Sequence, residues 1–399
     1  MANTNARVKL TASTSAKATN NRLFARIKEK PSFATVFFYA VFFLVTIAFF
    51  VFLHLKFTSM KKAAILFILV SLLCSVTSWA QPGKKAVVAF YNLENLFDTI
   101  NDPNKNDEQF LPDGDYRWNS DRYKAKLEAL STVISEMAKI EGGLVVLGVS
   151  EVENEKVLLD LAATEKLKPY GLKVCHHESP DRRGVDVSFF YDPARFRVID
   201  TASFPLVVPN EPEFISRDQW LMTGILDNTD TLYILVNHWP SKSGGERRSL
   251  PGRLAAGTLS HTIADNILKN HPGAKFILMG DLNDNPNSKA IMECLGTKTN
   301  TKNLTIYDLY NPMWKMFHDG IGSYAYRDSW EMLDNMVVSG GLVFPRANTY
   351  RFVSAHVFRK DFMFTKTGSY RGYPFRTFAG GNYQGGYSDH LPVYIILSK

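Results

Sequence analysis

Two short strings in the C-terminal half of the chain constrain its fold more than any other feature. Asp281 and Asn283 follow the apolar run Phe276–Met279, and the string Ser388–His390 precedes the apolar run Leu391–Tyr394. Such runs are typical of buried strands. Residues two apart on a strand point to the same side, so Asp281 and Asn283 should present their side chains together. The strings therefore predict polar groups gathered at the ends of buried strands.

Helix and strand patterns are mixed along the rest of the chain. Apolar periodicity predicts helices at 121–140, 155–167 and 253–268. Buried strands are expected at 87–91, 144–149, 185–191, 232–237, 276–279, 336–338 and 393–397. Strands mixed with helices, together with direct strand-to-strand joins, predict an α/β fold of stacked sheets with helices outside. Residues 201–230 and 340–385 contain no interpretable motif.

Two apolar segments occupy the N-terminus. Residues 33–55 contain no Asp, Glu, Lys or Arg and could span a bilayer, which needs about 20 residues. Basic residues precede this segment, so its start should face the cytoplasm. Residues 60–80 begin Met60-Lys61-Lys62, continue with an apolar stretch and end with small residues. These are the three parts of a secretory signal peptide.

A signal peptide belongs at the start of a chain. We therefore expect Met60 to be the initiator and residues 1–59 to be an untranslated extension; the alternative is a genuine membrane anchor at 33–55. The first case predicts a secreted or periplasmic protein, and the second a membrane-anchored one. Residues 81–399 would then form the main domain, long enough to bury a large core.

The formal net charge of +7 comes from the N-terminus. Residues 1–80 hold ten of the 46 basic residues and one of the 39 acidic residues, so residues 81–399 carry 36 basic and 38 acidic residues, a net charge of −2. Net charge therefore gives no argument that the main domain binds nucleic acid. Its two cysteines are Cys175 and Cys294, and the sequence leaves their pairing open.

Acidic, amide and imidazole side chains recur at the predicted strand ends. They are Asn92, Glu94, Glu151, His238, Asp281, Asn283, Asp389 and His390. Magnesium takes oxygen ligands, usually one or two carboxylates with waters and substrate phosphate. A histidine with a pKa near neutrality can donate or accept a proton. The pattern predicts a magnesium-dependent site that cleaves phosphate esters.

From about Val87 to Tyr394 the chain resembles the endonuclease/exonuclease/phosphatase superfamily, which includes deoxyribonuclease-like enzymes and sphingomyelinases. Six motifs in the family's order carry the resemblance: Phe90–Glu94, Val149–Val152, Asn237–Ser241, Gly280–Asn283, Leu333–Met336 and Ser388–His390. The resemblance implies that 81–399 is the catalytic domain. It also implies a four-layered α/β sandwich, in which two mixed β-sheets pack face to face with helices outside.

The same resemblance implies roles for individual residues. The metal ligands would be Glu151 as the main ligand, with Asn92, Glu94 and Asp389 around it. The catalytic residues would be Asp281, which draws a proton from water; Asn283, which supports the phosphate; His238 and His390, which bind phosphoryl oxygens or protonate the leaving group; and Asp334 and Asp186, which orient His390 and His238 respectively. The metal is expected to be magnesium, with manganese or calcium as alternatives and the number of ions open.

Simpler explanations exist for several of these residues. Asp281 and Asn283 also suit an Asx turn. Glu153 is expected to be a solvated neighbour of the site or a charge at a helix N-terminus. His176 is expected at the surface or in a loop. Arg253 is expected on a solvated helix face, or else at a rim that contacts phosphate.

The function expected is that of an exported, metal-dependent phosphodiesterase. A monomeric nuclease that hydrolyses DNA by in-line attack of an activated water is the first hypothesis, with DNA favoured over RNA. A phosphatase or a sphingomyelinase-like phosphodiesterase on the same fold is the alternative, and a non-catalytic binding protein is disfavoured. Any membrane contact would be made through the N-terminal segment alone. The sequence does not distinguish endonuclease from exonuclease.

Overall fold

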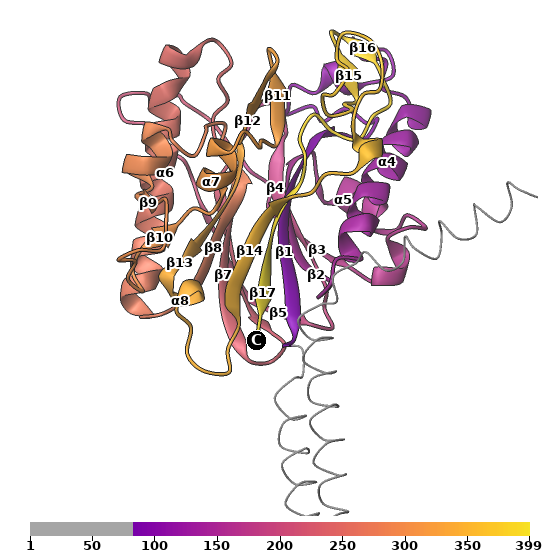
Figure 1. Ribbon diagram of the computed structural model, residues 1–399. Helices are drawn as coiled ribbons and strands as arrows, with labels where there is room; N and C mark the ends of the chain where they lie inside the picture. The colour runs from indigo at the N-terminus through magenta and orange to yellow at the C-terminus, as the bar shows by residue number, and fades with distance from the viewer. Residues whose placement is uncertain (1–82) are drawn as a thin grey trace, which may run out of the picture. The chain divides into compact units, whose positions relative to one another are not determined.

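Two mixed β-sheets lie face to face in the computed structural model, which describes residues 83–399 (Figure 1). The extension 1–59, its apolar segment 33–55 and the signal peptide 60–80 lie outside the described residues. Within residues 83–399, no helix is both long and apolar enough to cross a membrane.

The first sheet has six strands in the order β14-β17-β1-β2-β4-β3. Their bounds are β1 Lys85–Leu96, β2 Leu144–Val152, β3 Lys173–His176, β4 Asp186–Tyr191, β14 Arg351–Val357 and β17 Val393–Ser398. The first strand, β1, runs parallel to β2 and antiparallel to β17. The last strand of the chain therefore lies inside this sheet, between β1 and β14.

The second sheet has seven strands in the order β5-β6-β7-β8-β13-β10-β9. Their bounds are β5 Phe196–Phe204, β6 Gln219–Leu226, β7 Asp230–His238, β8 Lys275–Asp281, β9 Thr297–Lys298, β10 Leu309–Tyr310 and β13 Asp334–Ser339. Strand β8 runs parallel to β7 and antiparallel to β13.

The main core fills the space between the two sheets. Buried side chains from both sheets pack there, among them Phe90, Phe189, Val236 and Met279. Gly148 of β2 allows the two sheets to pack closely at this point, because a Cβ here would lie 2.4 Å from the sulfur of Met279. Glycine is therefore required at this point of contact between the sheets.

Helices cover the outer faces of both sheets (Figure 1). Helices α4 (Ser120–Ala138) and α5 (Glu155–Ala162) pack on the first sheet, and α6 (Glu246–Asn270) packs on the second. Asn119 and Asn154 begin α4 and α5 by accepting hydrogen bonds from backbone N–H groups of the first turn. The layers are helix, sheet, sheet and helix, so the predicted four-layered sandwich is confirmed.

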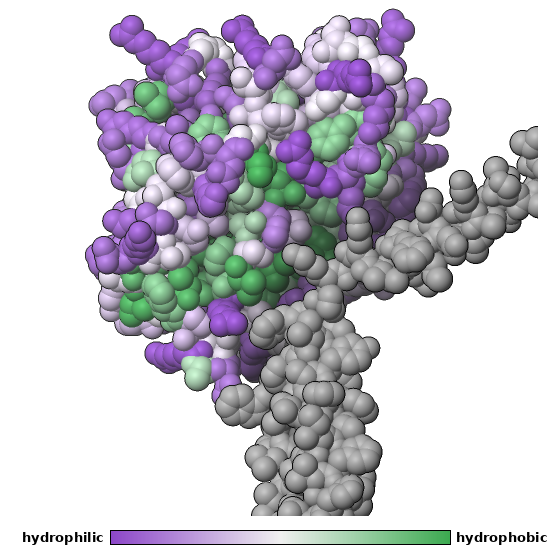
Figure 2. Space-filling model, viewed as in Figure 1, coloured by the Kyte–Doolittle hydropathy of each residue, from purple (hydrophilic) through white to green (hydrophobic). Residues whose placement is uncertain are grey.

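Shorter elements connect these layers. They are α7 (Met313–His318), α8 (Gly340–Val343), the hairpin β11 (Tyr324–Tyr326) and β12 (Ser329–Glu331), the hairpin β15 (Phe378–Ala379) and β16 (Asn382–Tyr383), and four single-turn helices at Glu108–Phe110, Lys168–Tyr170, Ala290–Cys294 and Asp361–Met363. Both hairpins stand at the end of the sandwich opposite the C-terminus (Figure 1). The surface at that end is largely hydrophilic in Figure 2.

The predicted helices and strands are present with shifted ends. The helix expected at 155–167 ends at Ala162, and the helix expected at 253–268 extends over Glu246–Asn270. The segments without an interpretable motif contain all of β6, the end of β5 and all of β14. Cys175 and Cys294 are free thiols.

Candidate active site

Three of the predicted catalytic residues lie side by side at one end of the second sheet. Asp281, at the end of β8, is paired in register with His238 on β7 and with Asp334 on β13. All three side chains are buried. The parallel and antiparallel pairing on the two sides of β8 therefore places two carboxylates and an imidazole at one level of the sheet.

Asn92 on β1 links this row to the first sheet. Its side-chain Nδ2 donates to Oδ2 of Asp281 at 3.1 Å and to Oε1 of Glu151, on β2, at 3.2 Å. The backbone N–H of Asn95 donates to the other oxygen of Glu151 at 3.0 Å. The site thus lies where the ends of the two sheets meet, with Asn92 holding one carboxylate from each sheet.

Three site residues have left-handed backbone conformations. The φ angles are +50° at Glu94, +58° at Glu151 and +49° at Asn283. Residues other than glycine seldom adopt such angles, which cost on the order of 1 kcal/mol or more each. Strained backbone of this kind concentrates at functional sites.

Asp334 and His390 form the pair that the sequence predicts. Nδ1 of His390 donates to Oδ2 of Asp334 at 2.7 Å, and the hydroxyl of Ser323 donates to the same oxygen at 2.5 Å. Nε2 of His390 lies 3.8 Å from Oδ2 of Asp281. Asp334 therefore fixes the imidazole with its other nitrogen toward the carboxylate at the end of β8.

The two histidines have opposite protonation preferences. Burial opposes a charge on His390, but the carboxylates of Asp334, Asp281 and Asp389 outweigh it and raise the pKa of His390 well above its ordinary value. Burial and the positive charge of Arg217 lower the pKa of His238 well below the ordinary value. At neutral pH the site thus holds one imidazolium and one neutral imidazole.

The carboxyl group of Asp281 is poised to exchange a proton. Burial and the negative charges of Asp334 and Glu151 raise the pKa of Asp281 to about 7, although His390 opposes the shift. The backbone N–H of Asn283 donates to Oδ1 of this carboxylate at 2.9 Å. A carboxyl group that titrates near neutrality can serve as a general base or acid.

One group of donor atoms in the site is compact enough to hold a metal ion. Nε2 of His238 lies 3.7 Å from Oε1 of Glu151 and 3.7 Å from Oδ2 of Asp281, and donor atoms of the three residues all fall within 4.8 Å of one another. Two carboxylates suit magnesium or manganese. Glu151 would therefore be the main ligand of the ion, with Asp281 and His238 beside it.

The other predicted metal ligands are arranged differently. Asn92 turns its Nδ2, not its oxygen, toward the two carboxylates, and its Oδ1 accepts a hydrogen bond from the N–H of Glu94 at 2.9 Å. The carboxylate of Glu94 accepts from the N–H of Thr377 at 2.7 Å and pairs with buried Lys126 at 3.6 Å. As arranged here, neither side chain provides a ligand oxygen to the compact group.

Asp389 lies beside this group. Its carboxylate is 3.9 Å from Nε2 of His390 and 3.9 Å from Nη1 of Arg376. Burial and the negative charge of Asp389 raise the pKa of Glu94. Asp389 and Glu94 therefore form a second acidic pair next to Glu151 and Asp281.

The contact expected between Asp186 and His238 does not form. Asp186 instead accepts hydrogen bonds from the backbone N–H and hydroxyl of Ser179, and its Oδ2 faces His176 at 3.5 Å. No ion pair joins Asp186 to His238 within 4.0 Å, and Nδ1 of His238 has no hydrogen-bond partner. The loop before β4 gives Asp186 nearer partners than the histidine on β7.

The side-chain amide of Asn283, expected to support the phosphate, is used in a contact within the protein. Its side-chain Nδ2 donates to the backbone carbonyl of Trp239 at 3.0 Å. With its N–H on Asp281, Asn283 ties the end of β8 to the segment that follows His238. It orders the site in this arrangement and does not offer its amide to a phosphate.

Sequence reasoning missed three residues of the site. Ser323 bonds to Asp334, Tyr324 packs on His390 with ring centroids 4.8 Å apart, and Arg376 reaches Asp389. They belong to irregular segments and a short hairpin, and no apolar run or motif marks these positions in the sequence. Arg253 was also misjudged, because it is fully buried and paired with Asp284 at 3.0 Å.

Comparison with known proteins identifies the family of the chain. A family model described as the endonuclease/exonuclease/phosphatase family matches residues 87–399. The chain therefore belongs to this family and is a hydrolase acting on phosphoester bonds. The family generally uses a divalent metal, and the donor set of Glu151, Asp281 and His238 fits such an ion.

Several solved structures resemble the chain at low sequence identity. A humanized TDP2 from D. rerio is 10% identical, with 79% of this chain and 100% of that chain covered and a TM-score of 0.49. An endonuclease/exonuclease/phosphatase family protein from Bacteroides thetaiotaomicron is 16% identical, with 79% and 98% covered and a TM-score of 0.47. A mannosyl-6-phosphatase from Bacteroides thetaiotaomicron VPI-5482 is 16% identical, with 79% and 100% covered and a TM-score of 0.46. No curated protein matches the sequence.

Proposed function

We propose that the protein is a magnesium-dependent phosphodiesterase that hydrolyses DNA. The observation that carries the proposal is the pair of histidines with opposite protonation preferences, whose Nε2 atoms lie 3.7 Å and 3.8 Å from Oδ2 of Asp281. In-line hydrolysis of a phosphodiester needs a proton acceptor for water and a donor for the leaving oxygen. The neutral imidazole of His238, the charged imidazole of His390 and the carboxyl group of Asp281, with a pKa of about 7, supply the proton acceptor and the proton donor.

The residues act as follows under this proposal. Asp281 takes a proton from the attacking water, while Asn283 holds that carboxylate in place. His390, kept charged by Asp334, donates hydrogen bonds to phosphoryl oxygens or protonates the leaving group. His238, in its neutral form, accepts a hydrogen bond from the water or the substrate. A bound divalent ion, held mainly by Glu151, would neutralise the charge that develops on the phosphoryl oxygens.

The hairpin β11–β12 favours a nucleic-acid substrate over a lipid. Tyr324 of this hairpin packs on His390, and Tyr326, two residues further on the same strand, is 51% exposed. Alternate residues of a strand share a face, so Tyr326 continues the face that borders the site. The guanidinium of Arg327 lies 5.2 Å from the Tyr326 ring. An exposed aromatic ring beside a cation is the arrangement that stacks on nucleotide bases.

The substrate is tested with a panel of phosphoesters. The purified full-length chain is incubated with plasmid DNA, RNA, sphingomyelin and inositol phosphates, each with magnesium or with EDTA. Cleavage of DNA that requires magnesium supports the proposal. Cleavage of sphingomyelin or of inositol phosphates with intact DNA would reject it in favour of the alternative on the same fold.

A variant of the hairpin separates substrate binding from chemistry. Tyr326→Ala should raise KM for DNA several-fold and leave the hydrolysis of bis(p-nitrophenyl) phosphate unchanged, because the small ester cannot reach the ring. Tyr307→Ala is the matched control, since Tyr307 is similarly exposed, at 53%, but belongs to the loop before β10. Equal effects of both substitutions on DNA would remove Tyr326 from the substrate path.

We also propose that the protein is exported after cleavage of the segment 60–80. The charged start at Met60, the apolar stretch and the small residues before Gln81 support this proposal. Expression from Met60 in a Gram-negative host should give an exported protein whose N-terminus lies near Gln81. N-terminal sequencing that found an uncleaved chain held by 33–55 in the native membrane would overturn it.

A further inference from the structure

A second cluster of potential metal ligands lies outside the site described above. It comprises His176 at the end of β3, Glu178 in the loop that follows and Asp186 at the start of β4. Nε2 of His176 is 3.5 Å from Oε2 of Glu178 and 3.5 Å from Oδ2 of Asp186. Donor atoms of the three residues lie within 4.8 Å of one another, so the cluster is already assembled.

Two of the three donor atoms are buried and have no hydrogen-bond partner. They are Oδ2 of Asp186, a residue with no exposed surface, and Nε2 of His176. The remaining atoms of both groups are used, because Oδ1 of Asp186 accepts from Ser179 and Nδ1 of His176 bonds to the Ser188 hydroxyl at 2.7 Å. Leaving buried polar atoms unpaired is costly, and these two atoms face each other.

The spacing of the cluster suits a metal ion better than a hydrogen bond. A separation of 3.5 Å between His176 and Asp186 exceeds the roughly 2.7–3.2 Å of an N–H···O hydrogen bond. Zinc bonds of about 2.0–2.2 Å to nitrogen and oxygen, at tetrahedral angles, place neighbouring donor atoms roughly 3.3–3.5 Å apart. Ser188 holds Nδ1 of His176, as the outer partner of a metal-bound imidazole does.

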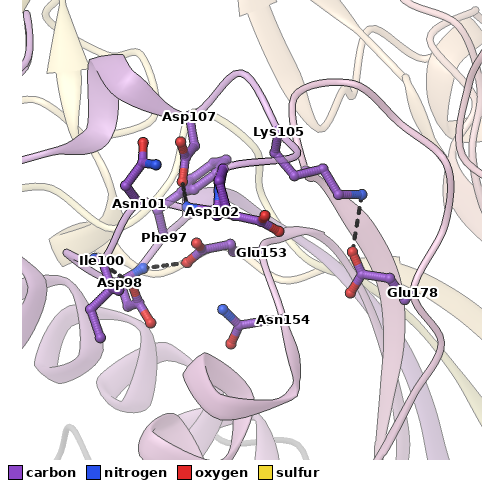
Figure 3. A pocket seen from close by; sticks show the side chains of 12 residues that line it. Phe97, Asp98, Ile100, Asn101, Asp102, Lys105, Asp107, Glu153, Asn154 and Glu178 are labelled. Atoms are coloured by element: carbon purple, nitrogen blue, oxygen red, sulfur yellow. Dashed lines mark hydrogen bonds and ion pairs between the residues drawn. The ribbon is translucent and has the colours of Figure 1, made fainter.

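The surroundings provide both charge and access for a cation. Nζ of Lys105 holds Oε1 of Glu178 at 3.0 Å, which leaves Oε2 to face His176. Glu178 also lines a pocket of about 300 Å³, together with Asp98, Asp102, Asp107 and Glu153 (Figure 3). Several carboxylates around one opening raise the local cation concentration. Glu178 therefore joins the cluster to a pocket lined by several carboxyl groups.

We propose that His176, Glu178 and Asp186 bind a zinc-type transition-metal ion at a site separate from Glu151. One imidazole and two carboxylates form a ligand set that zinc accepts, and three protein ligands leave one tetrahedral position for water. The ion ties the loop 177–185 to β3 and β4. Asp186 is paired in register with Val152, the neighbour of Glu151, so this ion supports the strand that carries the first metal site.

The test uses full-length protein with Glu151→Gln, which weakens the first site, after metal has been removed with EDTA and dialysis. Competition with a chromophoric chelator measures zinc binding, and cobalt(II) substitution reports the geometry by visible absorption. We expect one equivalent of zinc bound and a cobalt spectrum of tetrahedral intensity. Adding Glu178→Ala should weaken zinc binding at least tenfold and abolish that spectrum.

A matched control and a folding check keep the result decisive. Glu213→Ala, at another exposed glutamate, should leave zinc affinity and the cobalt spectrum unchanged. Melting without metal should show that the Glu178→Ala protein is folded, since this side chain is 55% exposed, while zinc should raise Tm only in the parent. A second variant, His176→Gln, should also lose the site. Failure of the parent to bind zinc, or equal binding in the parent and Glu178→Ala, overturns the proposal.

Discussion

Oδ2 of Asp334 accepts two hydrogen bonds, from Nδ1 of His390 at 2.7 Å and from the hydroxyl of Ser323 at 2.5 Å. The carboxylate is fully buried, so little solvent screens its charge from the imidazole. The contact sets both the orientation and the protonation state of His390. The two residues therefore form one hydrogen-bonded unit.

The first prediction concerns this unit. His390→Ala should lower kcat/KM by about 10²–10⁴-fold, the range typical of a lost general acid, and Asp334→Asn should lower it somewhat less. The double variant should lose about as much as His390→Ala alone, because the losses within one unit do not add. The measurement is kcat/KM on plasmid DNA for the four proteins of the cycle. Strictly additive losses would show that Asp334 does not serve His390.

The second prediction concerns the magnesium ion. Glu151→Gln keeps the shape of the side chain and removes its charge, so it should weaken magnesium binding at least tenfold and abolish most activity at limiting magnesium. Calorimetric titration with magnesium and activity against magnesium concentration check both effects. Glu165→Gln, at an exposed glutamate, serves as the control. Full activity of Glu151→Gln at limiting magnesium would remove Glu151 from the site.

The third prediction concerns the contact between the two sheets. A methyl group at Gly148 would lie 2.4 Å from the sulfur of Met279 and 3.1 Å from Cγ2 of Val236. Gly148→Ala should therefore lower the free energy of unfolding by about 1–3 kcal/mol, as overpacked cores do. Met279→Val should restore part of this loss by making room. Denaturant unfolding of both variants measures these changes in the free energy of unfolding. An unchanged midpoint for Gly148→Ala would contradict the predicted clash.

The fourth prediction concerns stability in acid. Burial alone would raise the pKa of Asp227, but hydrogen bonds from Arg195, Lys84 and Tyr350 outweigh it and hold this pKa well below the ordinary value. A depressed folded-state pKa gives stability that is fully present above the unfolded pKa, about 3.9, and is lost as pH falls below it.

Asp227→Asn should therefore cost roughly 1–3 kcal/mol of stability near neutrality, since it leaves charged donors unsatisfied. The difference from wild type should shrink as the pH falls below about 4. Unfolding measured in urea from pH 7 to pH 3 checks the sign. A difference that stayed constant down to pH 3 would show that the pKa of Asp227 is not depressed by folding.

The sequence predicted most of the central strands, although it missed β6, and it predicted the edge strands poorly for a physical reason. Strands β1, β8 and β17 have one or both faces in a core, so apolar residues mark them. Strand β5 is exposed along much of its length, and the short β3 is only partly buried. Such edge strands form because their backbones hydrogen-bond to a neighbouring strand. Their side chains are not buried, so the sequence shows no apolar pattern that marks them.

The residues of the candidate site also differ in how well the sequence predicted them. Polar residues directly at the ends of buried strands, such as Glu151, Asp281 and His238, are brought together as expected. Contacts made by loops were not predictable, because Ser179 and His176 decide where Asp186 points. Glu153, expected to be solvated or at a helix N-terminus, does precede the N-cap of α5, but it is buried and accepts from the N–H of Asp98 at 2.6 Å. The order of the motifs indicates which strand ends lie close together. The conformation of the loops decides which side chains contact one another there.

The position of β17 between β1 and β14 links the closing of the first sheet to the assembly of the candidate site. One of the two neighbours of β1 in its sheet is β17, residues 393–398, which lies far from β1 along the chain. Long-range pairing of this kind forms late and slowly. His390 lies three residues before β17, and the strand that closes the sheet also delivers that imidazole to Asp334. The pairing of β17 with β1 therefore also brings His390 to Asp334, and a protein truncated before residue 388 would lack both the strand and the imidazole.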